Sequence, residues 1–99
     1  MTDLRGKYVI VRANSAGVFA GEFVDKENDA VELKNMRRIW YWEGAASLSQ
    51  LAESGTSKPN ECKFPEVVSG PVILQNVIEI ICCTEKAKIS IEGVPVWKK

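Results

Sequence analysis

Short β-type segments separated by polar turns fill the N-terminal part of the chain, and they constrain the fold more than any other feature. Four segments combine β-branched and aromatic residues or alternate apolar with polar side chains, as half-buried strands do. They are residues 7–12 (KYVIVR), 18–24 (VFAGEFV), 30–34 (AVELK) and 37–42 (RRIWYW). Residues 14–17 (NSAG) provide turn chemistry and residues 25–29 (DKEND) predict a polar hairpin loop. Gly21 indicates a bulge or a close backbone approach. The pattern predicts an antiparallel meander.

The second half of the chain predicts further strands. Residues 63–68 (KFPEVV) form a short strand in which Pro65 implies an edge position. Residues 72–82 (VILQNVIEIIC) are the most β-prone segment, with an interruption at residues 75–76. Within this segment, residues 77–81 are apolar on both faces except for Glu79. This composition favours a central strand or a strand at a subunit interface.

Two short helices are expected where the apolar period changes. Ser47 followed by Gln50 is a capping box, which begins a helix over residues 47–53 that Gly55 ends. Thr84 can cap a second helix over residues 85–91. We therefore predict an α+β fold in a single domain over residues 1–99, with an antiparallel sheet or partly closed barrel of about six short strands and two short helices.

The segment RRIWYW at residues 37–42 concentrates charge and ring area. In a strand, Arg38, Trp40 and Trp42 share one face, while Arg37, Ile39 and Tyr41 share the other. One interpretation is structural: the arginine stems cover ring surface in a core or subunit interface and pair with Glu22 or Glu32. The other is a binding surface on which rings stack against a flat ligand while an arginine holds its phosphate or carboxylate.

Charge balance argues against duplex nucleic acid as a partner. The chain has 13 basic and 13 acidic residues, whereas proteins that neutralise phosphates normally carry a basic excess. The arginines are Arg5, Arg12, Arg37 and Arg38. Because only arginine offers a planar bidentate fork, we expect any anion site in the N-terminal half.

No enzyme activity, metal site or cofactor is expected. The chain has no histidine, the commonest general base, and three cysteines that are best explained as structural thiols. Glu79 in its apolar strand is the best candidate for a raised pKa, although such a carboxylate more often pairs with an arginine. The chain shows no signal peptide and no apolar run long enough for a bilayer, so a reducing cytoplasm is expected.

Four stretches carry a family likeness: YVIVRANSAGVFAGE, RRIWYWEGAASLSQLAESGTSKPNECKF, VIEIICCTEKA and the terminal VPVWK. Together they resemble a widespread family of small phage-encoded proteins of uncharacterised function, with the central signature RRIWYW-GA-SLSQLA. The resemblance implies a phage or prophage gene that acts in the cytoplasm of the bacterial host. It brings no catalytic residues.

The first functional hypothesis is a non-catalytic homo-oligomer that sequesters a nucleotide-like immune signal and so counters host defence. Small phage proteins that trap nucleotide signals at subunit interfaces need only a stiff β scaffold, rings and arginines. The expected ligand-binding residues are Arg12, Arg37, Arg38, Trp40, Tyr41 and Trp42. The alternatives are a protein-interaction module or inhibitor that binds a host protein, since Trp, Tyr and Arg also dominate protein hot spots, and an accessory protein of the virion.

Self-association is expected on independent grounds. The two short helices can cover only one face of a small sheet, while residues 77–81 are apolar on both faces. Large exposed apolar patches are uncommon on soluble monomers. A homo-oligomer would shield the second face and would place residues 40–42 near a subunit boundary.

Overall fold

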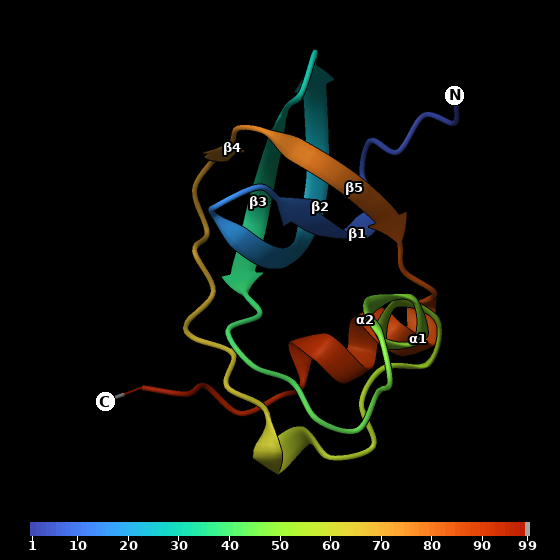
Figure 1. The fold of residues 1–99 in the computed structure, drawn as a ribbon, viewed down its shortest axis with the longest axis vertical. Helices are drawn as coiled ribbons and strands as arrows, with labels where there is room; N and C mark the ends of the chain where they lie inside the picture. Colours follow the sequence, from blue (N-terminus) through green and yellow to red (C-terminus); the bar gives the residue numbers. More distant parts are fainter. Residues whose placement is uncertain (99) are drawn as a thin grey trace.

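The computed structural model describes residues 1–98 and contains one curved antiparallel sheet with two helices on one side (Figure 1). The sheet has the strand order β4-β3-β2-β1-β5, and every neighbouring pair is antiparallel. The strands are β1 (Tyr8–Ala13), β2 (Gly17–Glu27), β3 (Ala30–Arg38), β4 (Val72–Leu74) and β5 (Val77–Cys82). The helices are α1 (Leu48–Ser54), α2 (Glu85–Glu92) and the short 3₁₀ helix η1 (Pro59–Glu61). The α+β prediction is confirmed, with five strands.

Strong curvature follows from the connection between the two edge strands. β4 and β5 lie at opposite edges of the sheet, yet only Gln75 and Asn76 separate them in the chain. The edges must therefore come close together, and the backbone N–H of Val77 donates to the carbonyl oxygen of Asp29 at 2.9 Å. Register shifts in the pairing of β2 with β3 bend the long central strand. The sheet stays open, because no ladder joins β4 to β5.

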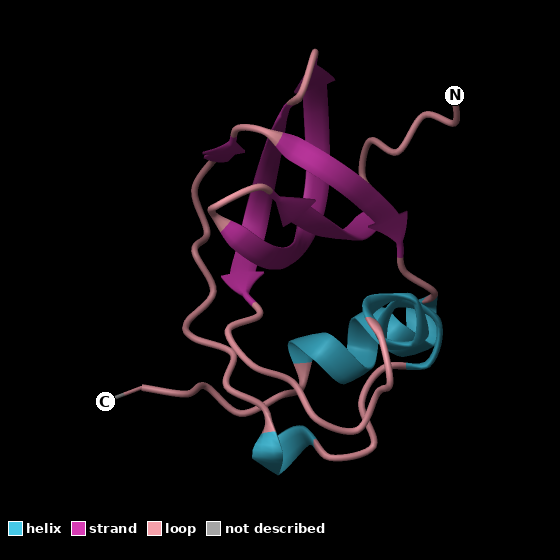
Figure 2. Cartoon of the chain, in the orientation of Figure 1, coloured by secondary structure: helices cyan, strands magenta, loops and turns pink. Residues whose placement is uncertain are grey.

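Two hydrophobic clusters lie on opposite faces of the sheet. One cluster draws its residues from all five strands and none from a helix, so the curved sheet encloses it; Val9, Val11 and Phe19 are members. The other joins the opposite face of β1, including Ile10, to the helices, and Leu51 of α1 is fully buried there. Figure 2 shows both helices on one side of the sheet. The alternating side chains of β1 thus enter both clusters.

This arrangement corrects two expectations about residues 77–81. The segment forms β5, which is an edge strand and not a central one. Ile80 packs into the cluster inside the sheet, whereas Ile81 packs into the cluster under the helices. Curvature of the sheet therefore covers part of the face for which a second subunit was invoked, while Ile78 stays 57% exposed.

The predicted helix caps are confirmed. The Ser47 hydroxyl accepts a hydrogen bond from the backbone N–H of Gln50 at 3.1 Å, and the Gln50 side chain accepts one from the N–H of Ala46 at 2.8 Å. At α2, the Thr84 hydroxyl accepts from the N–H of Ala87 at 3.1 Å and donates to the carbonyl of Glu53 at 2.7 Å. Thr84 therefore caps its own helix and ties it to α1.

Three predicted segments differ from the structure. β2 extends to Glu27, so the hairpin turn covers only residues 28–29. The reason is that polar residues 25–27 continue the ladder with β3 beyond the core. The strand predicted at residues 37–42 belongs to β3 only as far as Arg38. Residues 63–68 make isolated bridges in place of a strand, with Lys63 opposite Tyr41 and Val68 opposite Met36. Pro65 lacks the N–H that a continuous ladder would use.

Candidate functional site

Arg37 lies in the interior, where its guanidinium joins distant parts of the chain. Its side chain is 1% exposed and donates five hydrogen bonds, at 2.8 to 3.2 Å, to four carbonyl oxygens. The acceptors are Phe64, Pro65, Ile91 and Val94. Burial lowers the pKa of this guanidinium from its ordinary value. Because the donors are used within the chain, Arg37 stabilises the fold and is not placed to hold a ligand.

Arg38 and Arg12 occupy two separate places on the surface. The guanidinium of Arg38 donates to the carbonyl of Ala16 at 2.9 Å and lies 4.5 Å from the ring centre of Phe19. Arg12 forms an ion pair with Glu79 at 3.0 Å, between half-exposed side chains. The expected pairing of arginines with Glu22 is not found, because Glu22 pairs with Lys34 at 3.7 Å. The described contacts bring neither Arg12 nor Arg38 to the aromatic residues at positions 40–42.

The predicted alternation of faces holds as far as Trp40 and then fails. Arg37 and Ile39 are buried, while Trp40 is 66% exposed, as alternation requires. Tyr41 is also exposed, however, whereas Trp42 packs against the helix-side cluster and its indole N–H donates to the carbonyl of Ala45 at 3.2 Å. The reason is local: the chain has left the sheet after Arg38, so no ladder enforces the period of two.

The exposed rings of this segment meet two residues from elsewhere in the chain. Lys63 donates its backbone N–H to the carbonyl of Tyr41 at 2.8 Å. Its ammonium group lies 5.6 Å from the ring centre of Tyr41 and 5.7 Å from that of Trp97, within the range of cation–π attraction. The backbone N–H of Trp97 in turn donates to the carbonyl of Phe64 at 3.0 Å. We call Trp40, Tyr41, Lys63 and Trp97 the ring surface.

Hydrogen bonds within the chain hold the backbone of the ring surface in place. The amides of Trp40 and Tyr41 both point at the carbonyl of Lys63, at 3.2 and 3.3 Å. The Tyr41 hydroxyl donates to the carboxylate of Glu43, and this hydrogen bond raises the pKa of Tyr41. The sequence does not predict Lys63 and Trp97 as members, because their partners are distant in the chain and no local pattern encodes the contact.

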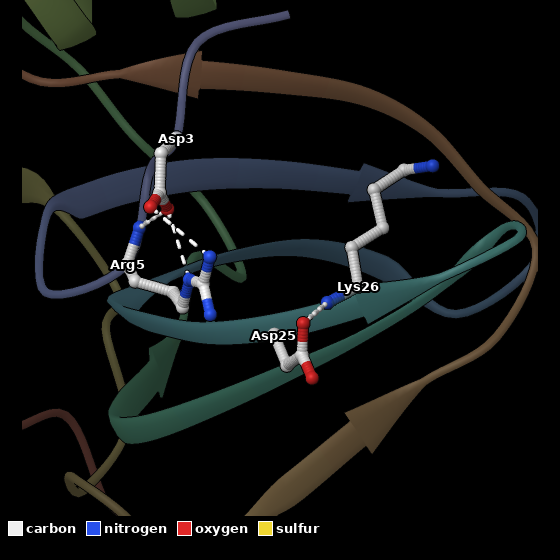
Figure 3. Close-up of polar contacts among 4 residues, drawn as sticks. All are labelled: Asp3, Arg5, Asp25 and Lys26. Atoms are coloured by element: carbon white, nitrogen blue, oxygen red, sulfur yellow. Dashed lines mark hydrogen bonds and ion pairs between the residues drawn. The ribbon is translucent and has the colours of Figure 1, made fainter.

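A separate groove of about 730 Å³ runs between the N-terminal segment and β5. Its apolar wall includes Phe23 and Ile80, and Figure 3 shows polar residues of the N-terminal segment and of β2 that also line it. Arg5 donates to Asp3 at 3.0 Å and thereby holds the pKa of that carboxyl below its usual value. On β2, the carboxylate of Asp25 accepts a hydrogen bond from its neighbour's backbone N–H. Asp3 and Arg5 are therefore engaged with each other, and Asp25 and Lys26 with backbone groups.

Comparison with known proteins identifies a family without an assigned activity. A family described as "Domain of unknown function (DUF6948)" matches residues 6–91. The chain belongs to the DUF6948 family. No curated protein and no solved structure matches it significantly. The DUF6948 match includes Arg37, Trp40, Tyr41 and Lys63 of the residues discussed above, whereas Trp97 lies beyond it.

In this DUF6948 domain the reactive groups are dispersed. Cys62 is buried and its thiol lies 3.5 Å from the carbonyl oxygen of Glu43. Burial raises the pKa of Cys83 to about 12, which disfavours its thiolate at neutral pH. Glu79 pairs with Arg12 at the surface. Within residues 1–98, no three Cys, Asp or Glu side chains gather where they could hold a metal ion, and no helix is long and apolar enough to cross a membrane.

Proposed function

We propose that this chain is a non-catalytic binding protein and that the ring surface binds a partner protein. The observation that carries the proposal is Trp40, whose indole is 66% exposed although its backbone is held by Lys63. Tyr41 is 44% exposed beside it. Trp and Tyr are the residues that most often supply interface hot spots, because they bury a large area at low entropic cost. A fixed backbone lowers the ordering cost further.

The surroundings of the ring surface favour a protein over a small ligand. Small molecules are usually held in concave sites that surround most of their surface. The groove of about 730 Å³ and a second hollow of about 430 Å³ are both lined by residues outside 37–42. Arg37 and Arg38, the expected phosphate contacts, donate to backbone carbonyls. Exposed rings that lie outside both hollows suit a protein interface better than a phosphate site.

Sequestration of a nucleotide-like signal is the second candidate. Lys63 supports it, because its ammonium lies beside two rings and could meet a phosphate while a base stacks on Trp40. The sequence resemblance to phage-encoded proteins supports the cytoplasm of a bacterial host as the setting for either role. The sequestering role would counter host defence, and the protein-binding role would make the chain an adaptor or inhibitor.

Two measurements on the same variants separate the candidates. The tagged chain is incubated with bacterial lysate, and its thermal midpoint is measured against cyclic nucleotides and ADP-ribose derivatives. We expect a stoichiometric host protein that Trp40→Ala releases and Ile89→Ala, an equally exposed site on α2, retains. Loss of a Trp hot spot should weaken binding by about 30-fold or more.

The other outcomes are equally informative. A rise in the thermal midpoint with one nucleotide, abolished by Trp40→Ala, would replace the first candidate with the second, because a ligand of the folded state stabilises it by mass action. Binding of a host protein that is unaffected by Trp40→Ala and Tyr41→Ala would show that the ring surface is not the site. If neither class binds, both candidates fail.

A further inference from the structure

The outer edge of β5 carries backbone groups without partners. The N–H of Cys83 donates to the carbonyl of Tyr8 at 2.9 Å, which fixes the phase of the β1–β5 ladder. Alternate residues of an antiparallel strand point their N–H and C=O groups to opposite sides. Ile80 and Cys82, three positions and one position before Cys83, therefore direct these groups away from β1. Within residues 1–98, no backbone hydrogen bond satisfies them.

The edge also lacks most of the features that keep edges from pairing. Natural edge strands are guarded by lysines, prolines or bulges. β5 has the sequence VIEIIC, without lysine or proline, and its one register shift lies near Ile78. The only charge, on Glu79, is neutralised by Arg12 at 3.0 Å. Ile78 is 57% exposed at this edge, and the groove along residues 77–80 leaves room beside it.

We propose that β5 is a self-association site, where a second copy of this chain adds its own β5 in antiparallel orientation. A two-fold axis at Ile81 places Ile80 opposite Cys82 of the second copy, and the reverse. This register satisfies all four unpaired backbone groups of each strand with N–H···O=C bonds. Two copies meet without net electrostatic repulsion, because the formal net charge of the chain is zero.

Size sets the strength of this association. Pairing along a strand of six residues covers less surface than the roughly 1,200 Å² that marks the lower limit of stable complexes. We therefore expect a weak, concentration-dependent dimer and not an obligate one. The site lies on the sheet edge, away from the ring surface, and stands whether or not the proposed function is correct.

Sedimentation of the full chain from micromolar to millimolar concentration, with reductant present, tests the assignment. The average mass should rise toward twice the 11.0 kDa of one chain. Two variants should abolish the rise: Ile78→Lys, which puts a charge on the edge, and Cys82→Pro, which removes an outward N–H.

Matched controls make the result specific. Cys82→Ser keeps the N–H and should dimerise as the natural chain does. Ile73→Lys places the same charge on β4, at the opposite edge, where Ile73 is 54% exposed, and it should also dimerise. A natural chain that stays monomeric throughout would overturn the proposal. So would loss of association in Ile73→Lys, because pairing would then run head to tail from β4 to β5. Circular dichroism confirms that each variant is folded.

Discussion

The guanidinium of Arg37 donates a hydrogen bond to the carbonyl oxygen of Val94 at 2.9 Å, although 57 positions separate the two residues. A second bond from the same nitrogen reaches the carbonyl of Ile91 at 3.1 Å, in the last turn of α2. Carbonyl groups at a helix C-terminus have no partner within the helix and attract positive charge. One buried arginine on β3 thus holds the end of α2 and the segment that follows it.

Replacement of Arg37 should destabilise the fold severely. Arg37→Ala removes the guanidinium that four carbonyls share, leaves those of Pro65 and Val94 without a donor and opens a cavity. We therefore expect a loss of about 3 kcal/mol or more in the free energy of unfolding. Urea denaturation measures this loss. Arg38→Ala is the matched control, because Arg38 is exposed and makes one hydrogen bond, and it should cost about 1 kcal/mol or less. Equal stability of the two variants would contradict the structural role of Arg37.

Gly21 marks a close approach between β2 and β3. A methyl group at this position would lie 2.9 Å from the Cα atom of Met36, which is backbone and cannot move aside. Gly21→Ala should therefore lower the free energy of unfolding by about 1–3 kcal/mol. Gly70→Ala is the control, because its added methyl group would meet nothing within 4 Å, and its effect should stay within about 0.5 kcal/mol. A neutral Gly21→Ala would show that the two strands can separate without cost.

Alkaline pH should destabilise the chain through Cys83. Burial raises its pKa to about 12 from an ordinary 9.0, so between these values the unfolded thiol ionises while the folded thiol keeps its proton. The unfolded state then binds fewer protons, and the free energy of unfolding falls as pH rises from 9 toward 12. Denaturation at several pH values should show a shallower fall for Cys83→Ala. Part of the slope should remain, because burial also raises the pKa of Tyr8. An unchanged slope would contradict the burial of Cys83.

The three thiols should differ in reactivity at neutral pH. Cys82 is exposed, Cys62 is buried, and Cys83 is half-buried with a raised pKa. A chromogenic disulfide reagent should therefore modify one thiol per chain rapidly and the other two only on the timescale of unfolding. Cys82→Ser should remove the rapid phase, and addition of urea should make all remaining thiols react quickly. A rapid phase that survives Cys82→Ser would show that another cysteine is open to solvent.

Local signals were sufficient to predict much of the fold. The capping residues Ser47 and Thr84 sit at helix starts because a side-chain oxygen meets an N–H only three positions away. The turn at residues 14–17 is also encoded locally, and Gly17 adopts a φ of 114° there. The curvature of the sheet could not be predicted in this way, since it depends on the pairing of β1 with β5 across most of the chain.

The candidate site was less predictable for the same reason. Sequence placed Arg37 and Trp40 on opposite faces of one segment, as the structure has them, but could not say which face was covered. The acceptors of Arg37 lie 27 to 57 positions away. The contact of Lys63 with two rings likewise requires residues from three separate segments. A face or partner set by long-range packing leaves no periodic signal in the nearby sequence.

The long separation of β1 and β5 along the chain has a consequence for the order of folding events. Strands β1 to β3 pair through short turns, so this hairpin pair can form from contacts between near neighbours. β5 must find β1 over a much longer loop, as the 67 positions between Arg12 and Glu79 show. Closing this loop costs entropy before the stabilising contacts between β1 and β5 form. We therefore expect the pairing of β5 with β1 to be the slow step of folding. Until β5 arrives, the side chains of Val9 and Val11 lack part of their cover, so a nascent chain that has not yet reached Cys82 exposes a hydrophobic interior to its surroundings.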